Sequence, residues 1–323
     1  MKKIKIGSLE LSNNIILAPM SGITDFPYRQ LVKKCGGVGL VVSEMIASRA
    51  MINNALDAIR RSKIDSHDKF SSIQLAGCEA EVIALAAKMN EDMGASIIDL
   101  NFGCPAKKVV NGYSGSALMK DEKLAQKIFE LTVRSVKIPV TVKMRLGWDE
   151  NNKNALKLSK IAENSGIQMI TIHARTRSQF FSGNVDWSFV SDIKKSVKIP
   201  VIINGDIKSF VTAKQALELS CADGIMVGRG CYGKPWLFKQ LSDFLNHGIE
   251  NSPPNKEKQM QIILEHYDHM IEYYGVESGL KIARKHLGWY SNGIKNSSHF
   301  RAKINQSNSS EDVKYYVQDL FAG

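Results

Sequence analysis

The chain has 323 residues, 44% of them hydrophobic, which is enough to bury one large barrel with an appendage or two ordinary domains. No apolar run reaches the roughly 18 residues that a membrane span needs, and residues 1–6 lack the apolar segment of a secretion signal. We therefore expect a soluble, cytoplasmic protein that does not bind membranes. The net charge of +11 fits a polyanionic partner.

Apolar runs rich in β-branched residues recur about every thirty residues and predict eight strands. They cover residues 15–20, 38–45, 71–77, 96–104, 139–147, 169–175, 200–207 and 224–230. Amphipathic helical stretches separate most of them. Continuous apolar strands alternating with helices indicate a parallel sheet covered on both faces. We predict an α/β fold, a TIM (β/α)8 barrel followed by a small all-helical C-terminal domain.

Helical periodicity also predicts how individual segments pack. In residues 79–93 the pattern places Val82, Leu85, Ala86 and Met89 on the buried face. Residues 246–256 are polar, contain paired prolines and are typical of a linker. Residues 258–274 and 278–291 then have helical periodicity without strand runs. We expect a barrel over residues 1–245, a linker over 246–256 and a helical domain over 257–323.

The fourth predicted strand ends in Asn101, Phe102, Gly103, Cys104 and Pro105, followed by a Gly/Ser-rich loop over residues 111–116. An amide before a thiol and a cationic loop after it suggest a proton-donating site closed by a lid. A buried free cysteine followed by an ordinary proline turn is the alternative. The chain has five cysteines, and no pair has C-x-x-C spacing. Neither a disulfide framework nor a metal site is therefore expected.

The other predicted strand ends also carry polar groups, and these gather on one face of a TIM barrel. Gly205, Gly228 and Arg229 follow the seventh and eighth strands, where this fold commonly holds phosphate. Lys143 lies within an apolar strand, so it pairs either with a structural carboxylate or with an anionic cofactor ring. Together with Gln74 and His173, these groups suit flavin mononucleotide (FMN).

Several motifs together resemble the bacterial tRNA-dihydrouridine synthases, most closely the B-type subgroup. They are residues 18–25, 99–109, 115–118, 142–148, 172–177, 204–206, 228–230 and 282–290. The resemblance covers nearly the whole chain, and the motif around Cys104 is highly specific. The chain departs from the pattern at Ala174, where many relatives have Gly, and at Tyr113 and Ser114 in the lid loop.

The resemblance implies an FMN enzyme that reduces the C5–C6 bond of D-loop uridines in tRNA, with NADPH reducing the flavin. Cys104 would be the proton donor to C5. The residues implied to bind FMN are Pro19, Met20, Ser21, Gln74, Lys143, His173, Asn204, Gly205, Asp206, Gly228 and Arg229. The residues expected to bind substrate are Asn101, Lys107, Arg145, Arg175, Arg177, Lys281, Arg284 and Lys285.

Charge in the C-terminal part supports an RNA partner, because residues 278–310 contain six Lys and Arg but no Asp or Glu. A merely solvated helix face is the alternative. Two further functions stay open: a flavin barrel acting on a free pyrimidine, similar to dihydroorotate dehydrogenase, and a non-catalytic RNA-binding barrel. We expect a monomer. The tRNA position reduced and the preference for NADPH over NADH do not follow from the sequence.

Overall fold

The computed structural model describes residues 3–65 and 70–322, and its backbone contacts divide the chain into two compact units. The first unit comprises residues 1–26 and 38–228, and the second comprises residues 27–37 and 229–323. The helix α1 (Phe26–Cys35) thus joins the second unit except for its first residue. The expected domain boundaries at residues 245 and 257 stay a prediction.

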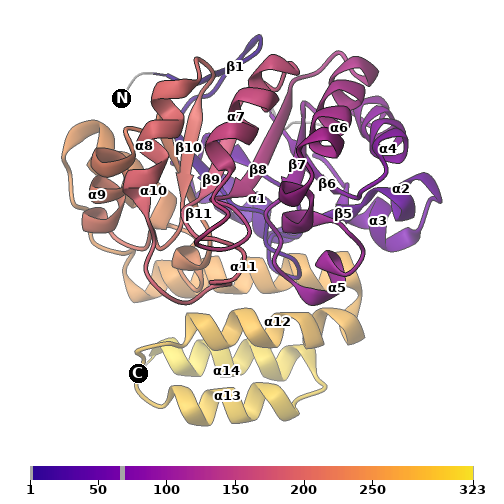
Figure 1. Cartoon of the computed structure of the whole chain (residues 1–323). Coiled ribbons are helices and arrows are strands. Elements are labelled where there is room, and N and C mark those ends of the chain that lie inside the picture. Colours follow the sequence, from indigo (N-terminus) through magenta and orange to yellow (C-terminus); the bar gives the residue numbers. More distant parts are fainter. Residues whose placement is uncertain (1–2, 66–69, 323) are drawn as a thin grey trace. The chain divides into compact units, whose positions relative to one another are not determined.

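The first unit is built on a parallel sheet, and each of the eight predicted runs contains one of its strands, whereas the additional strand β5 begins one residue beyond the second run (Figure 1). The strands are β3 (Ile15–Leu17), β4 (Leu40–Val41), β5 (Ile46–Ala47), β6 (Ser72–Ala76), β7 (Ile97–Phe102), β8 (Val140–Arg145), β9 (Ile170–His173), β10 (Val201–Asn204) and β11 (Gly224–Val227). Their spatial order is β4-β3-β11-β10-β9-β8-β7-β6-β5. The chain therefore visits the positions around the sheet in sequence, as in a TIM barrel.

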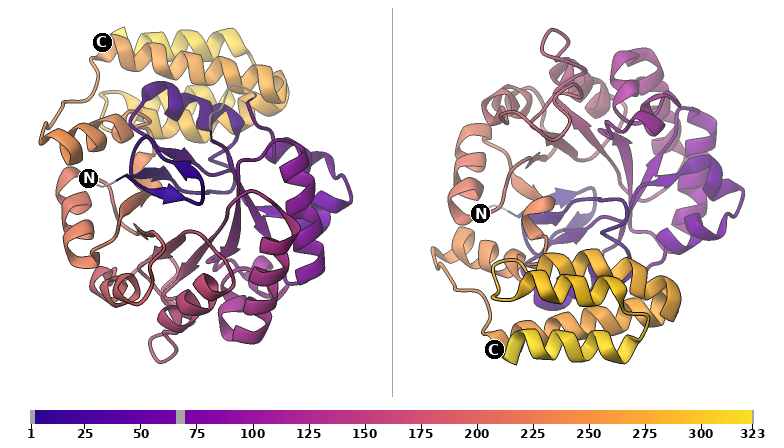
Figure 2. Two further views of the ribbon diagram at one scale, coloured as in Figure 1. Left: turned by 90° about the horizontal axis from the view of Figure 1, so that it is seen from above. Right: turned by 90° about the horizontal axis from the view of Figure 1, so that it is seen from below.

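The second predicted strand, residues 38–45, contains only β4, and β5 begins just after it at Ile46; the sheet closes between these two strands. β4 pairs with β3, whereas β5 pairs with β6. Between them Val42 forms a parallel bridge to Ser72, and the Ser43 N–H donates to the Ser72 carbonyl at 2.9 Å. The two ends of the sheet are thus joined, and Figure 2 shows the strands encircling one axis. The predicted barrel is confirmed.

Helices follow most strands and lie outside the sheet, as Figure 2 shows. Those of the first unit are α2 (Ser48–Ile52), α3 (Leu56–Arg61), α4 (Ala80–Asp92), α5 (Lys107–Val110), α6 (Glu122–Ser135), α7 (Ala155–Asn164), α8 (Trp187–Ser196) and α9 (Phe210–Ser220), with the 3-10 helix η1 (Gly115–Lys120). The ring of Phe102 on β7 lies 4.9 Å from that of Phe129 on α6. Alternate residues of β7 therefore face the helices, and the others, including Asp99 and Asn101, face the barrel interior.

The predicted buried face of the helix over residues 79–93 is wrong by about one position. Leu85 is 59% exposed, whereas Ile83, Ala86 and Ala87 are buried. Asn90 is also buried, and its side-chain amide donates to the Ala86 carbonyl at 2.7 Å, which compensates for the loss of water. Small alanines allow close approach of the helix, so the larger leucine was a poor guide to the packed face.

An N-terminal hairpin of β1 (Lys5–Ile6) and β2 (Leu9–Glu10) packs against one end of the barrel interior. Ile4, Ile6 and Leu11 belong to the same buried cluster as interior strand residues such as Ile97 and Ile202. Apolar side chains therefore fill this amino-terminal end of the strands. The carboxyl ends are left to carry the polar residues.

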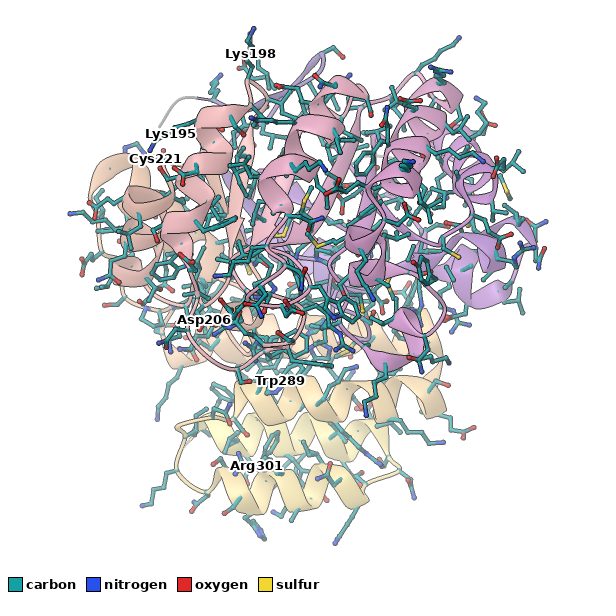
Figure 3. The ribbon with its side chains drawn as sticks, in the orientation of Figure 1. Lys195, Lys198, Asp206, Cys221, Trp289 and Arg301 are labelled. Atoms are coloured by element: carbon teal, nitrogen blue, oxygen red, sulfur yellow. The ribbon has the colours of Figure 1, made fainter. Side chains whose placement is uncertain are left out.

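The second unit is helical. Besides α1 it contains η2 (Arg229–Cys231), α10 (Leu237–His247), α11 (Lys256–Tyr274), α12 (Val276–Tyr290), α13 (Ser297–Gln306) and α14 (Ser310–Ala322). Leu280, Ala283, Leu287 and Tyr290 of α12 are buried in its core, as their spacing predicts. Trp289, labelled in Figure 3, stacks on Tyr232 with ring centroids 4.1 Å apart. Among the described residues, no helix is long and apolar enough to cross a bilayer.

Candidate active site at the carboxyl ends of the strands

A layer of polar side chains crosses the barrel interior from β6 to β8. Gln74 is paired in register with Asp99, and Asp99 with Thr141. Asp99 accepts from both neighbours at 2.7 Å, from Gln74 Nε2 on Oδ2 and from Thr141 Oγ1 on Oδ1. Burial raises the pKa of Asp99, although these two hydrogen bonds and the charge of Lys143 offset part of that rise.

Asn101 links this layer to the thiol segment. Its side-chain Nδ2 donates to Gln74 Oε1 at 2.7 Å. Its Oδ1 accepts from the backbone N–H of Cys104 at 3.0 Å and, more weakly, of Gly103 at 3.3 Å. Both ends of this amide are therefore bound within the protein. A contact of Asn101 with substrate stays a prediction.

The segment that carries Cys104 is also held from two other sides. The Cys104 carbonyl accepts from Ser116 Oγ at 2.9 Å, and the Gly103 carbonyl accepts from Arg145 Nε at 2.8 Å. Gly115 has φ +63°, and an added Cβ would lie 2.7 Å from the Cys104 carbonyl oxygen. Only glycine fits there without displacement. The Cys104 thiol is free and partly exposed, so the predicted lid residues lie directly against a fixed cysteine.

Lys143 lies beside Asn101 in the register of β7 and β8. Its side chain is partly exposed, yet desolvation by the surrounding strands and repulsion from Arg145 lower its pKa to about 8. Asp99 and Cys104 act in the opposite direction. Among the described residues, no group forms an ion pair or hydrogen bond with the Lys143 ammonium. The structural carboxylate considered as its partner is therefore not in contact with it, and a cation is available to an anionic group.

The ends of β9 and β10 bring further predicted residues together. His173 is paired in register with both Arg145 and Asn204. Gly205 has φ +125°, and a Cβ there would lie 3.1 Å from the His173 ring. Asn204 Nδ2 donates to the Met226 carbonyl at 2.8 Å, which fixes this strand end to β11. The glycine therefore permits backbone to approach an imidazole closely.

The loop after β3 lies next to the end of β11. The Met20 N–H donates to Thr24 Oγ1 at 2.9 Å, which closes a turn over residues 20–24 directly after Pro19. A Cβ on Gly228 would stand 3.7 Å from Met20 Sδ and equally far from Ala18 Cβ. The residues predicted from the first and eighth strands are thus neighbours. Arg229 begins η2 in the second unit, and its role as a phosphate ligand stays a prediction.

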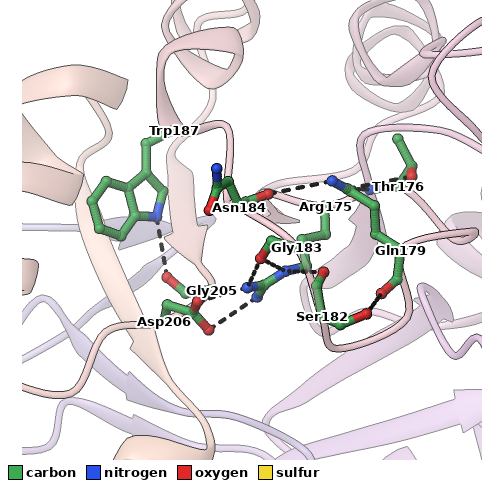
Figure 4. Close-up of polar contacts among 9 residues, drawn as sticks. All are labelled: Arg175, Thr176, Gln179, Ser182, Gly183, Asn184, Trp187, Gly205 and Asp206. Atoms are coloured by element: carbon green, nitrogen blue, oxygen red, sulfur yellow. Dashed lines mark hydrogen bonds and ion pairs between the residues drawn. The ribbon is translucent and has the colours of Figure 1, made fainter.

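Arg175 organises the loop after β9, as Figure 4 shows. It is 2% exposed and forms a bidentate pair with Asp206, with distances of 2.9 and 2.6 Å. Its NH2 group also donates to the Gly183 carbonyl at 2.6 Å. The Trp187 indole N–H donates to the Gly205 carbonyl at 3.1 Å. Arg175 and Asp206 hold each other in place, so their predicted roles toward substrate and FMN stay predictions.

The remaining predicted cations differ in exposure. Arg145 is 1% exposed, and its NH1 donates to the Thr176 carbonyl at 2.8 Å. Arg177 lies over the Trp148 ring at 4.6 Å. Lys107 is exposed at the start of α5.

The predicted cations of the second unit lie on α12. Lys281 is exposed and pairs with Glu277 at 2.8 Å, whereas Arg284 NH2 donates to the Ser307 carbonyl at 3.2 Å. Lys285 is half-buried on α12.

Sequence reasoning did not single out Asp99 and Thr141 as site residues. Both are buried and polar within runs of apolar strand residues. Asp99 stands two positions before Asn101, so it faces the same side of β7. This spacing of two residues from Asn101 was the feature of the sequence that could have identified Asp99 as a site residue. Among the described residues, no group of three or more His, Cys, Asp or Glu side chains is arranged to hold a metal ion.

The fold and the site define a TIM-barrel protein with a fixed cysteine and an interior cation at the carboxyl ends of its strands. A sequence model of the family described as dihydrouridine synthase (Dus) matches residues 16–322. The chain belongs to the dihydrouridine synthase family. The resemblance on which the sequence prediction depended is confirmed.

Individual relatives agree with the family. The chain is 61% identical over 319 residues to a probable tRNA-dihydrouridine synthase of Rickettsia bellii, covering 98% of both chains. It is 59% identical over 319 residues to a protein with the same description from Rickettsia prowazekii, covering 98% of this chain and 97% of the relative. It is also 41% identical over 323 residues to tRNA-dihydrouridine synthase B of Pseudomonas aeruginosa, covering 100% of this chain and 97% of the relative.

Proposed function

We propose that this protein is a tRNA-dihydrouridine synthase that reduces the C5–C6 bond of D-loop uridines in tRNA. The observation that carries the proposal is Cys104, a partly exposed thiol whose backbone is fixed by Asn101 and Ser116 at the end of a polar barrel interior. The relatives described as tRNA-dihydrouridine synthases support dihydrouridine formation in tRNA. A cytoplasmic location and a monomeric state stay predictions.

The interior of the barrel fits FMN. Lys143 offers a positive charge that pairs with no protein group among the described residues, which suits an anionic ring. Gln74, His173 and Asn204 would hold the polar edge of the ring system and its side chain. Gly205 and Gly228, with Pro19, Met20, Ser21 and Asp206 nearby in the strand-end loops, would accommodate the rest of the cofactor. FMN reduced by NADPH would supply the hydride that adds to C6 of uracil.

Cys104 would complete the reduction by giving its thiol proton to C5 of the uracil. A thiol that carries its proton can act as a general acid toward a carbon that gains negative charge. An arginine would be too weak an acid for this step. The hydrogen bonds to the backbone on either side of the thiol would keep its Sγ at a constant distance from the base. Asn101 and Arg145 would stabilise this geometry and the polar edge of the uracil.

A uridine must leave its stack to reach a site of this kind, which costs a few kcal/mol. Contacts to phosphates would offset that cost. In the first unit, exposed Lys107 follows Cys104 by three residues, and Arg177 lies on Trp148. In the second unit we assign phosphate contacts to α12, through Lys281, Arg284 and Lys285. Arg284 donates to the Ser307 carbonyl and Lys281 pairs with Glu277, so phosphate contacts of these two residues would compete with bonds inside the unit.

The proposal is tested by nucleoside mass spectrometry of unmodified tRNA transcripts incubated with the flavin-loaded protein and NADPH. We expect a gain of two hydrogens on D-loop uridines. Cys104→Ala should slow this by about 10²- to 10⁴-fold, the usual contribution of a general acid. Cys221→Ala, at an exposed cysteine that ends α9, is the matched control. NADPH oxidation without any gain on tRNA would indicate a small pyrimidine acceptor instead.

The RNA-binding assignment has its own test. Lys281→Glu combined with Lys285→Glu should weaken tRNA binding at moderate salt and leave the flavin content unchanged, because neither residue lies in the barrel. Lys160→Glu on α7 makes the same kind of charge change at an exposed position of the first unit. Equal tRNA affinity in the double variant and in Lys160→Glu would contradict the assignment.

A further inference from the structure

Asp99 has no role in the chemistry proposed above, although it is 2% exposed in the middle of β7. A buried carboxylate is costly unless hydrogen bonds or charges compensate it. Here both oxygens are compensated, by Gln74 Nε2 and by Thr141 Oγ1 at 2.7 Å each. The position could have held another apolar residue, like Ile97 and Ile98 before it. The presence of a carboxylate at position 99 therefore calls for an explanation other than packing.

The hydrogen bonds that end on Asp99 fix which group of each neighbouring amide donates and which accepts. An ionised carboxylate only accepts, so Gln74 must turn its NH2 group toward Asp99 and its oxygen away. That oxygen accepts from Asn101 Nδ2 at 2.7 Å, which turns Asn101 Oδ1 toward the next residues. Asn101 Oδ1 then accepts from the Cys104 N–H at 3.0 Å. Each amide has one orientation because the group before it leaves no other.

We propose that Asp99 is a positioning residue, which sets the orientation of Gln74 and Asn101 and through them holds the backbone of Cys104. The role of Cys104 as acid rests on the proposed function, whereas the chain of hydrogen bonds does not. Asp99 itself touches neither the thiol nor the proposed substrate. Its effect reaches the reaction through three consecutive hydrogen bonds.

Reversing the direction of these three hydrogen bonds would leave two donors facing each other. If residue 99 donated to Gln74, the Gln74 amide would turn over, and Asn101 would turn over in response. The Asn101 NH2 group would then meet the Cys104 N–H, so this anchor of the thiol segment would be lost. Displacement of a reacting group by an ångström slows catalysis on the order of 100-fold without a matching change in substrate binding. Turnover should therefore suffer more than the KM for tRNA.

The first experiment compares Asp99→Leu with Thr171→Val in the full-length, flavin-loaded protein. Leucine removes both acceptors. Thr171 is a buried interior residue whose hydroxyl has no partner among the described residues, so its replacement by valine is a control of equal burial. We expect Asp99→Leu to lower turnover about 10- to 100-fold with the tRNA KM within about twofold. Amide hydrogen exchange at Cys104 should accelerate in Asp99→Leu and stay unchanged in Thr171→Val.

A second variant separates direction from charge. Asp99→Asn removes the charge but keeps an oxygen for Gln74, because the Thr141 hydroxyl can turn to accept from the new NH2 group. A role through direction predicts a smaller loss of turnover for Asp99→Asn than for Asp99→Leu. A role through the charge near Lys143 predicts equal losses. Asp99→Asn also keeps the proposal testable if Asp99→Leu does not fold.

Adding Thr141→Val to Asp99→Asn completes the test. Valine cannot accept from the amide introduced at position 99, so the double variant no longer favours one orientation of the amide chain. Its loss of turnover should exceed the product of the two single losses, which is the signature of coupled residues. Multiplicative losses, or unchanged exchange at the Cys104 amide, would overturn the inference. Because hydrogen exchange needs no substrate, it decides on Asp99 even if the protein does not reduce tRNA.

Discussion

The barrel and the helical unit bury polar side chains in different ways. Around Asp99, hydrogen bonds from Asn101 through Gln74 and from Thr141 converge on the carboxylate as their final acceptor. In the second unit His266 and His286 are also buried, but the Nε2 atom of each ring has no hydrogen-bond partner among the described residues. The two rings meet edge to face with centroids 4.9 Å apart. His266 Nδ1 has one partner, the Tyr290 hydroxyl at 3.0 Å.

The difference shows in the titration of the two clusters. Desolvation lowers the pKa of His266 to about 3 and that of His286 well below its ordinary value. Desolvation instead raises the pKa of Asp99, and neighbouring donors oppose it. The histidines therefore act as neutral aromatic rings that fill the helical core. The carboxylate acts as an acceptor that orients its neighbours. Protons affect the stability of the two regions with opposite sign.

The largest expected effect is acid destabilisation of the helical unit. In the unfolded chain His266 and His286 take up protons below about pH 6.5, whereas folding keeps them neutral. Stability present above that pH is therefore lost as the pH falls from about 6.5 toward the lower folded value. With about 1.4 kcal/mol per pH unit and histidine, the loss at pH 4.5 reaches about 6 kcal/mol. Urea unfolding followed by near-ultraviolet circular dichroism at pH 7 and 4.5 measures it.

Asp99 contributes with the opposite sign, because its raised folded pKa means that the folded state gains protons more readily as the pH falls. Acid should therefore lower the stability of the barrel less than that of the helices. If the barrel and the helical unit lost the same amount of unfolding free energy at every pH, this difference would be contradicted.

His286→Phe should sharpen the comparison. Phenylalanine keeps an aromatic ring beside His266 and Trp289 but cannot take up a proton. We expect about half of the acid loss to disappear, or about 3 kcal/mol at pH 4.5. The same urea unfolding series measures it, with His247→Phe at the exposed end of α10 as control. An undiminished pH dependence would assign the acid loss to other groups.

Arg175→Lys tests directed hydrogen bonding elsewhere in the barrel. Lysine keeps the charge but cannot bind Asp206 in bidentate fashion while donating to Gly183. We expect a loss of about 2 kcal/mol in unfolding free energy and faster hydrogen exchange in residues 178–184. Arg134→Lys, at an exposed position of α6, should cost less than about 0.5 kcal/mol. Similar values for the two variants would sink the assignment of Arg175 as a loop anchor.

Thr171→Val has the smallest expected effect. The Thr171 hydroxyl is buried without a partner among the described residues, so its removal ends a desolvation cost and breaks no bond. We expect stability to be unchanged or to rise by up to about 1 kcal/mol. Thermal unfolding checks this. A loss greater than about 1 kcal/mol would mean that the hydroxyl has a partner and that the barrel layer extends to β9.

Much of the fold was predictable because strands buried on both faces form continuous apolar runs, such as residues 139–147 around β8. The break between β4 and β5 was not, since pairing of Val42 with Ser72 depends on how the sheet closes. Leu85 was assigned to the wrong face because its helical spacing from Val82 and Met89 fits a face one position away from the packed one.

Within the candidate site, the positions of Cys104, Lys143 and His173 near strand ends were predictable, whereas their roles stay predictions. The hydrogen-bond partners of Arg175 and Asp99 lie on or after neighbouring strands that are distant in sequence. Strand register therefore had to be known before the roles of these two residues could be assigned. Spacing along a single strand shows only which side of the sheet a residue faces.

The short pairing of β4 with β3 has a consequence for how the barrel opens. Among the described residues, β4 shares two registered positions with β3, whereas residues 42–47 share three with β6 and the other neighbouring strands of the barrel share three to five. Local unfolding begins where few backbone bonds must break. We expect β4 to separate from β3 before any other pair does, so that the closed ring becomes an open sheet with two free edges. Such edges can pair with other chains, which makes this junction the place where partial unfolding would lead to aggregation.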